Sequence, residues 1–203
     1  MIEVDGPTFF DVLRGQRACR SFLPEPVPEA DIERILTAAT WAPSAENLQP
    51  WEFVVVTDPD LRRRMGELTR RAWQGGARTY AAGRLSERFF ADVEAGATGG
   101  IASAPVIVVV AAESSPVTGS ALGSSIFPAV QNLLLAANAL GYGSALTTLT
   151  IAFERQLQEL LALPDRLAPM AVLPIGRPAR PLGRPRRHPV EERTHRNRYR
   201  SRV

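Results

Sequence analysis

The sequence of 203 residues predicts a chain in which helices alternate with the strands of a single sheet, an α/β or α+β arrangement. Two short runs rich in β-branched residues, 51–57 and 105–111, are typical of buried strands. A strongly apolar segment at 126–140 ends at Gly141, as expected of a helix that is buried on most sides. A chain of this length can bury one sizeable core but hardly two, so we expect a single domain over residues 1–203.

The other elements follow from helical or alternating periodicity between helix-breaking residues. Gly15 ends the first helix, and three prolines within residues 16–28 require an extended chain there. Asp58 followed by Pro59 is typical of a helix start, because aspartate caps the helix and proline fits its first turn. In chain order, we expect helices at about 8–13, 29–42, 59–71 and 85–93, a strand at 144–149, a helix at 153–162 and a strand at 170–175.

Composition indicates an ordinary globular chain that keeps its thiol reduced. Hydrophobic residues make up 45% and charged residues 22% of the sequence. Cys19 is the only cysteine, so no intrachain disulfide can form, and a reducing, cytoplasmic location is expected. The N-terminus does not resemble a secretory signal, and the longest apolar run, from Ala104 to Ala112, is far shorter than the ~20 residues of a membrane helix. We therefore expect no membrane partner.

Positive charge is concentrated at the C-terminus. All 24 basic residues are arginine, and ten of them lie in residues 177–203 beside two acids, which gives this C-terminal arm a net charge of +8. The other residues hold 14 arginines and 19 acids, a net charge of −5. Such an arm could bind nucleic acid, one phosphate-bearing cofactor, or an acidic surface of a partner subunit, because arginine contacts phosphate and carboxylate alike. Composition alone leaves these three alternatives open.

Several common catalytic chemistries lack their motifs in this sequence. It contains no GxxxxGK[ST], HExxH or CxxC motif, so phosphate-loop, zinc-protease and dithiol chemistry have no support. The Gly-Tyr-Gly at 141–143 resembles the start of a dinucleotide fingerprint, but it follows a helix and Leu146 replaces the third glycine. Both histidines, His188 and His195, lie in the arm. We therefore expect no metal site.

Two segments at opposite ends of the chain carry a family resemblance. Residues 16–56 contain, in order, an arginine-rich pentapeptide, a Phe, a Pro-Val-Pro helix start, Ala-Pro-Ser, an Asn, and Gln-Pro-Trp before a strand. Residues 130–149 hold the buried helix and the strand after it, and residues 171–192 hold a Leu-Pro-x-Gly-x-Pro turn and a basic-Pro-acidic motif. This order resembles the FMN-dependent nitroreductase family. Only residues 60–104 fall outside the main resemblance.

The resemblance implies an α+β, nitroreductase-like fold with a central mixed sheet flanked by helices and an extended C-terminal tail. It implies FMN as cofactor, NAD(P)H as co-substrate, and a homodimer that shares its flavin sites across the interface. The expected activity is a ping-pong transfer of hydride from NAD(P)H through FMN to a nitroaromatic, a quinone or a similar small-molecule electron acceptor. Residues 60–104 are then a variable excursion or lid. The cofactor phosphate accounts for part of the basic arm, so no nucleic acid is expected.

The resemblance also assigns cofactor-binding residues in the pentapeptide, namely Gln16, Arg17, Ala18 and Arg20. Arg20 is the candidate cation at the N1–C2=O edge of the flavin, where it would stabilise the charge gained on reduction. Arg17 is the candidate contact to the phosphate or ribityl chain. The family often has arginine where Gln16 stands and serine where Ala18 stands, so one contact is expected to be missing.

The flavin N5 atom carries the chemistry in this family, so no catalytic side chain is expected. Thr148 is the candidate contact to N5, and Arg187 is the candidate contact to the phosphate. The full set of expected cofactor-binding residues outside the pentapeptide is Pro43, Ser44, Asn47, Thr147, Thr148, Arg186 and Arg187.

Other functions remain open alternatives. The same fold supports reductive dehalogenation of iodotyrosine and dehydrogenation of substrates, and the Gly-x-x-x-x-x-Thr-Thr order at 141–148 resembles the deiodinase branch. That branch holds its substrate with a lid containing Glu, Tyr and Lys, whereas residues 60–104 contain no Lys and only Tyr80. General reduction therefore ranks above deiodination. A flavin-binding protein without catalysis and a nucleic-acid binder are the remaining alternatives.

Overall fold

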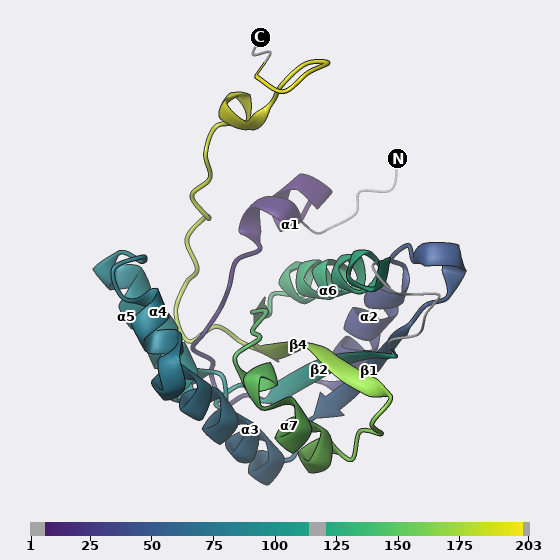
Figure 1. Ribbon diagram of the computed structural model, residues 1–203, viewed down its shortest axis with the longest axis vertical. Helices are drawn as coiled ribbons and strands as arrows, with labels where there is room; N and C mark the ends of the chain where they lie inside the picture. The colour runs from purple at the N-terminus through teal and green to yellow at the C-terminus, as the bar shows by residue number, and fades with distance from the viewer. Residues whose placement is uncertain (1–6, 114–120, 201–203) are drawn as a thin grey trace.

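The computed structural model describes residues 7–113 and 121–200 (Figure 1). Within them, four strands form one sheet in the order β1-β2-β4-β3, with helices on both of its faces. The strands are β1 (Trp51–Val56), β2 (Val106–Glu113), β3 (Gly143–Ser144) and β4 (Leu167–Gly176). The α-helices are α1 (Phe9–Gly15), α2 (Glu29–Thr40), α3 (Pro59–Ala72), α4 (Arg78–Ala81), α5 (Glu87–Ala95), α6 (Leu122–Ala139) and α7 (Glu154–Leu161).

β2 is the centre of the core because it is paired on both edges and covered on both faces. It pairs antiparallel with β1 and with β4. Val108 and Val110 pack in the cluster that includes α2 and α6, while Ile107 and Val109 pack in the cluster that includes α3 and α7. All four side chains are 0% exposed, which is why the strand is continuously apolar rather than alternating. The predicted central strand at 105–111 is confirmed.

Most predicted helices form where the periodicity places them. α2 buries Ile32, Ile35 and Ala39 against the sheet and α6. Asp58 caps α3 by accepting a hydrogen bond of 2.8 Å from the backbone amide of Leu61. α6 begins at Leu122 rather than at 126, and its first four residues, Leu-Gly-Ser-Ser, precede the apolar run from which the helix was predicted. No helix in the described part of the chain is long and apolar enough to cross a membrane.

The strand predicted at 144–149 is much shorter than expected. β3 pairs with β4 only at Gly143 and Ser144, and Thr147 forms one further isolated bridge with Val172. Between these two points the facing residue of β4 is Pro174, whose carbonyl accepts from Ala145 at 3.4 Å but which has no amide hydrogen to donate. The ladder is therefore interrupted, and the chain turns into the 3₁₀ helix η5 (Thr150–Phe153).

The α+β fold class is confirmed, with one qualification about the sheet. All pairs between the named strands are antiparallel. The parallel component of the expected mixed sheet is a single bridge between Ala18 and Ser144, which the amide of Cys19 supports by donating to the Ser144 carbonyl at 2.9 Å. The pentapeptide thus lies beside β3 at one edge of the sheet.

Residues 60–104 form a helical excursion whose two bends were not predicted. Five-residue π-helical turns, η2 (Trp73–Ala77) and η3 (Gly96–Gly100), join α3 to α4 and follow α5. Each turn contains a Gly-Gly pair, and Gly76 has a φ of 146°, a conformation that favours glycine. The excursion lies along one side of the molecule in Figure 1, next to the chain that precedes α2.

Two segments extend from the body of the molecule. α1 lies at its upper side in Figure 1, and the C-terminal arm extends beyond it. The apolar side chains of α1 are largely uncovered, with Phe9 67%, Phe10 68% and Leu13 39% exposed. The Asn138 side chain on α6 connects the two helices by donating a hydrogen bond of 2.9 Å to the Val12 carbonyl of α1. The described arm contributes no residue to the two main hydrophobic clusters.

Candidate functional site

A cavity of about 280 Å³ lies where three distant parts of the chain meet. Arg20 comes from the pentapeptide, a mostly apolar wall comes from residues 73–101, and the third wall is the segment 145–149 that follows β3. Trp73 and Tyr80 supply aromatic surface, and Arg20 is the only charged side chain among the described residues that line the space. We call this space the Arg20 cavity. Its walls suit a flat, largely apolar group that also has a polar edge.

Arg20 is held from several sides in this cavity. Its Nη1 donates to Oδ2 of Asp92 at 2.9 Å, and its guanidinium lies 5.4 Å from the centre of the Phe89 ring. The side-chain stem packs against Gly96, where an added Cβ would lie 2.8 Å from the Arg20 Cδ. A Cβ on Gly100 would lie 2.0 Å from the Arg20 carbonyl oxygen. The turn after α5 is therefore shaped to fit against Arg20.

Arg20 also keeps hydrogen-bonding capacity. A guanidinium has five N–H donors, and a single one of them is used in a hydrogen bond to the described residues. The side chain is 19% exposed, so its charge is partly shielded from water. A ligand with carbonyl or ring-nitrogen acceptors in the cavity could take up the donors that remain.

Thr147 and Thr148 line the same cavity from the opposite wall. The Thr147 amide donates to the Val172 carbonyl at 2.9 Å, and the Val172 amide donates back at 3.1 Å, which fixes this segment to β4. Thr148 is exposed, and its carbonyl accepts from Ile151 at 3.1 Å to open η5. The structure thus brings together Arg20, Thr147 and Thr148 of the predicted residues.

The other pentapeptide residues do not line the Arg20 cavity. Gln16 ends α1 and donates its amide to the Val12 carbonyl. Arg17 donates Nη1 to the Gly183 carbonyl at 2.9 Å, so it holds the start of the arm. Ala18 takes part in the bridge to Ser144. These three consecutive residues therefore each make a different contact, outside the Arg20 cavity.

Pro43, Ser44 and Asn47 lie in the loop between α2 and β1 and also do not line the cavity. The Ser44 hydroxyl accepts from the Gln49 amide at 3.0 Å. The loop contains three non-glycine residues with φ near +50°: Glu46, Asn47 and Gln49. Such conformations cost roughly 1–3 kcal/mol each and persist where the surroundings enforce them. Beside this loop, Trp41 is 76% exposed.

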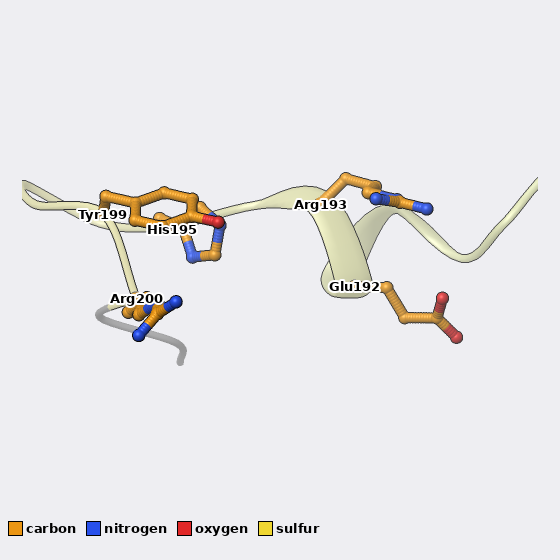
Figure 2. Close-up of a pocket in the computed structure, with 5 residues that line it drawn as sticks. All are labelled: Glu192, Arg193, His195, Tyr199 and Arg200. Carbon is orange, nitrogen blue, oxygen red and sulfur yellow. The ribbon is translucent and has the colours of Figure 1, made fainter.

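Arg186 and Arg187 are exposed residues of the arm, away from the Arg20 cavity. Arg187 Nη1 donates to the Arg186 carbonyl at 2.9 Å. Farther along the arm, Glu192, Arg193, His195, Tyr199 and Arg200 surround an open hollow of about 680 Å³. Figure 2 shows the His195 and Tyr199 rings close together, where they meet edge to face, while Glu192 and Arg193 point away, so these groups do not converge on one point. The expected phosphate ligands and the Arg20 cavity are thus separated within one chain.

Cys19 lies next to Arg20 but is not available for chemistry in this structure. Its side chain is 1% exposed, and the thiol donates to the Ser21 carbonyl at 3.3 Å. Burial raises the pKa of the Cys19 thiol, so the reactive thiolate is disfavoured. Cys19 is therefore a small packed residue of the core rather than a nucleophile.

Sequence reasoning missed the residues that surround Arg20. Asp92, Phe89 and Gly96 lie on or just after α5, and their spacing of three and four puts them on one helix face. That spacing was visible in the sequence, but it did not indicate which distant residue this face would meet. Trp73 and Tyr80 were likewise not assigned to the cavity.

Comparisons with known proteins agree with this architecture. A protein of Archaeoglobus fulgidus named "Putative NADH dehydrogenase/NAD(P)H nitroreductase" is 30% identical over 165 residues, which cover 80% of this chain and 81% of that protein. The 5,6-dimethylbenzimidazole synthase of Rhodobacter capsulatus is 31% identical over 177 residues, covering 83% and 82% of the two chains. A crystal structure of a BluB-like flavoprotein from Clostridium difficile has the same fold, with a TM-score of 0.73 at 24% identity over 93% of this chain and 98% of that one.

The family model described as Nitroreductase family matches residues 13–177, most of the chain. This range contains residues 16–56 and 130–149 and reaches Arg177 in the Leu-Pro-x-Gly-x-Pro turn, whereas the basic-Pro-acidic motif of the C-terminal arm lies beyond it. The chain belongs to the Nitroreductase family.

Proposed function

We propose that this protein is an FMN-dependent oxidoreductase that carries hydride from NAD(P)H to small acceptors such as nitroaromatics and quinones. The observation that carries the proposal is the convergence of Arg20 and the segment containing Thr147 and Thr148 on one cavity with apolar and aromatic walls. When bound, FMN would supply the two-electron chemistry. The chain would then bind and orient the cofactor and leave room for one flat substrate at a time.

The residues present fit the ring part of FMN. The unused N–H donors of Arg20 suit the N1–C2=O edge of a flavin, and a positive charge there favours the negative charge gained on reduction. Thr148 lies on the facing wall, where an amide or hydroxyl could donate to N5. Trp73 and Tyr80 provide apolar surface, which would exclude water from the bound ring.

The phosphate end requires groups that one chain does not bring to the cavity. Arg186 and Arg187 lie on the arm, and Ser44 and Asn47 lie in the loop after α2, none of them at the Arg20 cavity. We propose that a second copy of the chain completes each site, with the arm of one subunit reaching the other. In this arrangement residues 60–104 act as a lid over the ring and residues 177–203 as an arm, both within one domain of 203 residues.

Homodimerisation is the first prediction of this proposal. In the described residues, the apolar helix α6 is mostly buried inside the chain, so it provides little apolar surface for a partner. Other side chains do, because Phe9, Phe10 and Trp41 are each more than 60% exposed. We expect light scattering to give twice the mass of the chain when the protein is loaded with FMN. A loaded monomer would contradict the shared site while leaving the fold untouched.

The cofactor itself provides the second prediction. The purified protein, reconstituted if necessary, should show the absorbance bands of oxidised flavin, and anaerobic NADH or NADPH should bleach them. Mass spectrometry of the heat-released cofactor should give FMN, because the chain has no adenine-binding fingerprint. Recovering FAD would overturn the cofactor assignment, and a flavin that neither NADH nor NADPH reduces would leave a binding protein without this catalysis.

A second candidate function is a different reaction in the same cavity. The observation that favours it is the 31% identity to a 5,6-dimethylbenzimidazole synthase, which is no lower than the identity to the nitroreductase relative. Reductive dehalogenation and substrate dehydrogenation belong to the same group of alternatives. Steady turnover of NAD(P)H with a quinone or nitroaromatic acceptor favours the first proposal, and bleaching without turnover on these acceptors favours the second. We propose a cytoplasmic location and no nucleic-acid partner in either case.

A further inference from the structure

Asp92 connects two arginines that come from opposite ends of the sequence. Its Oδ2 accepts from Arg20 Nη1 at 2.9 Å, and its Oδ1 accepts from Arg180 Nη2. These partners are 72 and 88 residues away along the chain. The side chains of Asp92 and Arg20 are 20% and 19% exposed, so water screens this pair less than a fully exposed surface pair. One carboxylate therefore faces two guanidinium groups, and the cluster has a net charge of +1.

Asp92 is close to the Arg20 cavity without being part of its wall. Its neighbour Val93 and its partner Arg20 both line the space, whereas Asp92 and Arg180 are not among the described residues that do so. The carboxylate thus lies behind Arg20, in contact with its guanidinium but outside the wall of the cavity. Any effect of Asp92 on a ligand there is transmitted by charge rather than by contact.

Arg20 has other contacts that would keep it in place if Asp92 lost its charge. The Phe89 ring lies 5.4 Å from its guanidinium carbon, and Gly96 packs against its stem. Its backbone is fixed as well, since Gly100 approaches the Arg20 carbonyl where no larger residue fits. An Asp92→Asn substitution keeps the size of the side chain and one oxygen acceptor for Arg20. The main change is the loss of one negative charge behind the cavity.

We propose that Asp92 is a redox-tuning residue that lowers the reduction potential of a flavin bound in the Arg20 cavity. This inference rests on the proposed function. A flavin ring gains negative charge when it is reduced, which the positive charge of Arg20 favours. Asp92 offsets part of that positive charge, so it disfavours the reduced state relative to the oxidised state. Arg180 offsets part of the charge of Asp92 and acts in the opposite direction.

Two substitutions with opposite expected signs test the proposal. Asp92→Asn should raise the affinity for reduced FMN relative to oxidised FMN about fivefold to tenfold, which corresponds to a potential higher by roughly 20–30 mV for a two-electron couple. Arg180→Gln should change the same ratio in the other direction by about twofold to fivefold. The potential is measured against a reference dye on FMN-saturated protein, and the dissociation constant of oxidised FMN is measured separately by fluorescence quenching.

Glu87→Gln is the matched control. Glu87 is an exposed residue in the first turn of the same helix, so its substitution removes an equal charge without touching Arg20. The reduction potential of FMN bound to the Glu87→Gln variant should equal that of the parent protein. A purely structural role of Asp92 would change stability but would not raise the potential, and release of Arg20 from the cavity would lower it.

The outcomes separate this inference from the proposed function. If the parent protein binds no FMN, the proposed function fails. If the parent binds FMN and Asp92→Asn leaves the potential unchanged or lowers it, the tuning role is overturned and the proposed function stands. If Asp92→Asn does not fold, Arg180→Gln decides, because a lower potential supports the role of Asp92 and an unchanged or higher one contradicts it.

Discussion

Arg187→Ala is expected to weaken FMN binding ~10- to 150-fold. The reason is the loss of a charge-assisted hydrogen bond to the phosphate, which contributes about 1.5–3 kcal/mol. In the single chain Arg187 is exposed, and its Nη1 donates to the neighbouring Arg186 carbonyl. The side chain is thus placed to meet an anion on another surface. The dissociation constant should be measured by quenching of FMN fluorescence.

Arg198→Ala is the control for the general charge of the arm. Arg198 is also an exposed arginine, farther along the arm, and its loss should change the dissociation constant by less than about twofold at moderate salt. An unchanged constant for Arg187→Ala would mean that Arg186 or Arg184 holds the phosphate. Equal losses for Arg187→Ala and Arg198→Ala would mean that the arm acts only through its overall charge.

Arg20→Gln is expected to lower the reduction potential of bound FMN by roughly 20–65 mV. Glutamine keeps hydrogen-bonding capacity but removes the charge, and a lost, partly screened charge of about 1–3 kcal/mol corresponds to that shift at 30 mV per ~1.4 kcal/mol. Reduction by NAD(P)H should slow in parallel. The potential is measured against a reference dye with FMN at saturation, so that weaker binding does not affect the result.

Arg88→Gln controls for the removal of a positive charge nearby. Arg88 is exposed on α5 and does not line the cavity. The reduction potential of FMN bound to the Arg88→Gln variant should therefore match that of the parent protein. A potential within a few millivolts of the parent for Arg20→Gln would place the Arg20 guanidinium away from the flavin ring. In that case its ion pair with Asp92 would be structural, and the role proposed for Asp92 would fail with it.

The elements that sequence reasoning predicted well are those with strong local signals. The valine-rich run that forms β2 could only be a strand covered on both faces, and the Asp58-Pro59 pair marks the start of α3. The short β3 could not be predicted from its own residues. Its length depends on Pro174, which lies on another strand 30 residues away and interrupts the ladder.

The candidate site was predicted in part for a related reason. Arg20, Thr147 and Thr148 were assigned from the family pattern, and the fold brings them to one cavity. Asp92 and Phe89 lie in a segment without such a pattern, and no local signal connects them to Arg20. The roles of all these residues as cofactor contacts remain predictions, and for Ser44, Asn47 and Arg187 even the meeting with the cavity depends on a second copy of the chain.

The main strands and helices, the strongly basic arm and the family could be read from the sequence, because periodicity and capping act over a few residues and composition acts over the whole chain. Which distant charges meet depends instead on how these elements pack against one another. Asp92 faces both Arg20 and Arg180 because α5 folds back against the pentapeptide and the start of the arm. These contacts also depend on η3, where Gly96 and Gly100 let the chain approach Arg20 more closely than any larger residue would allow.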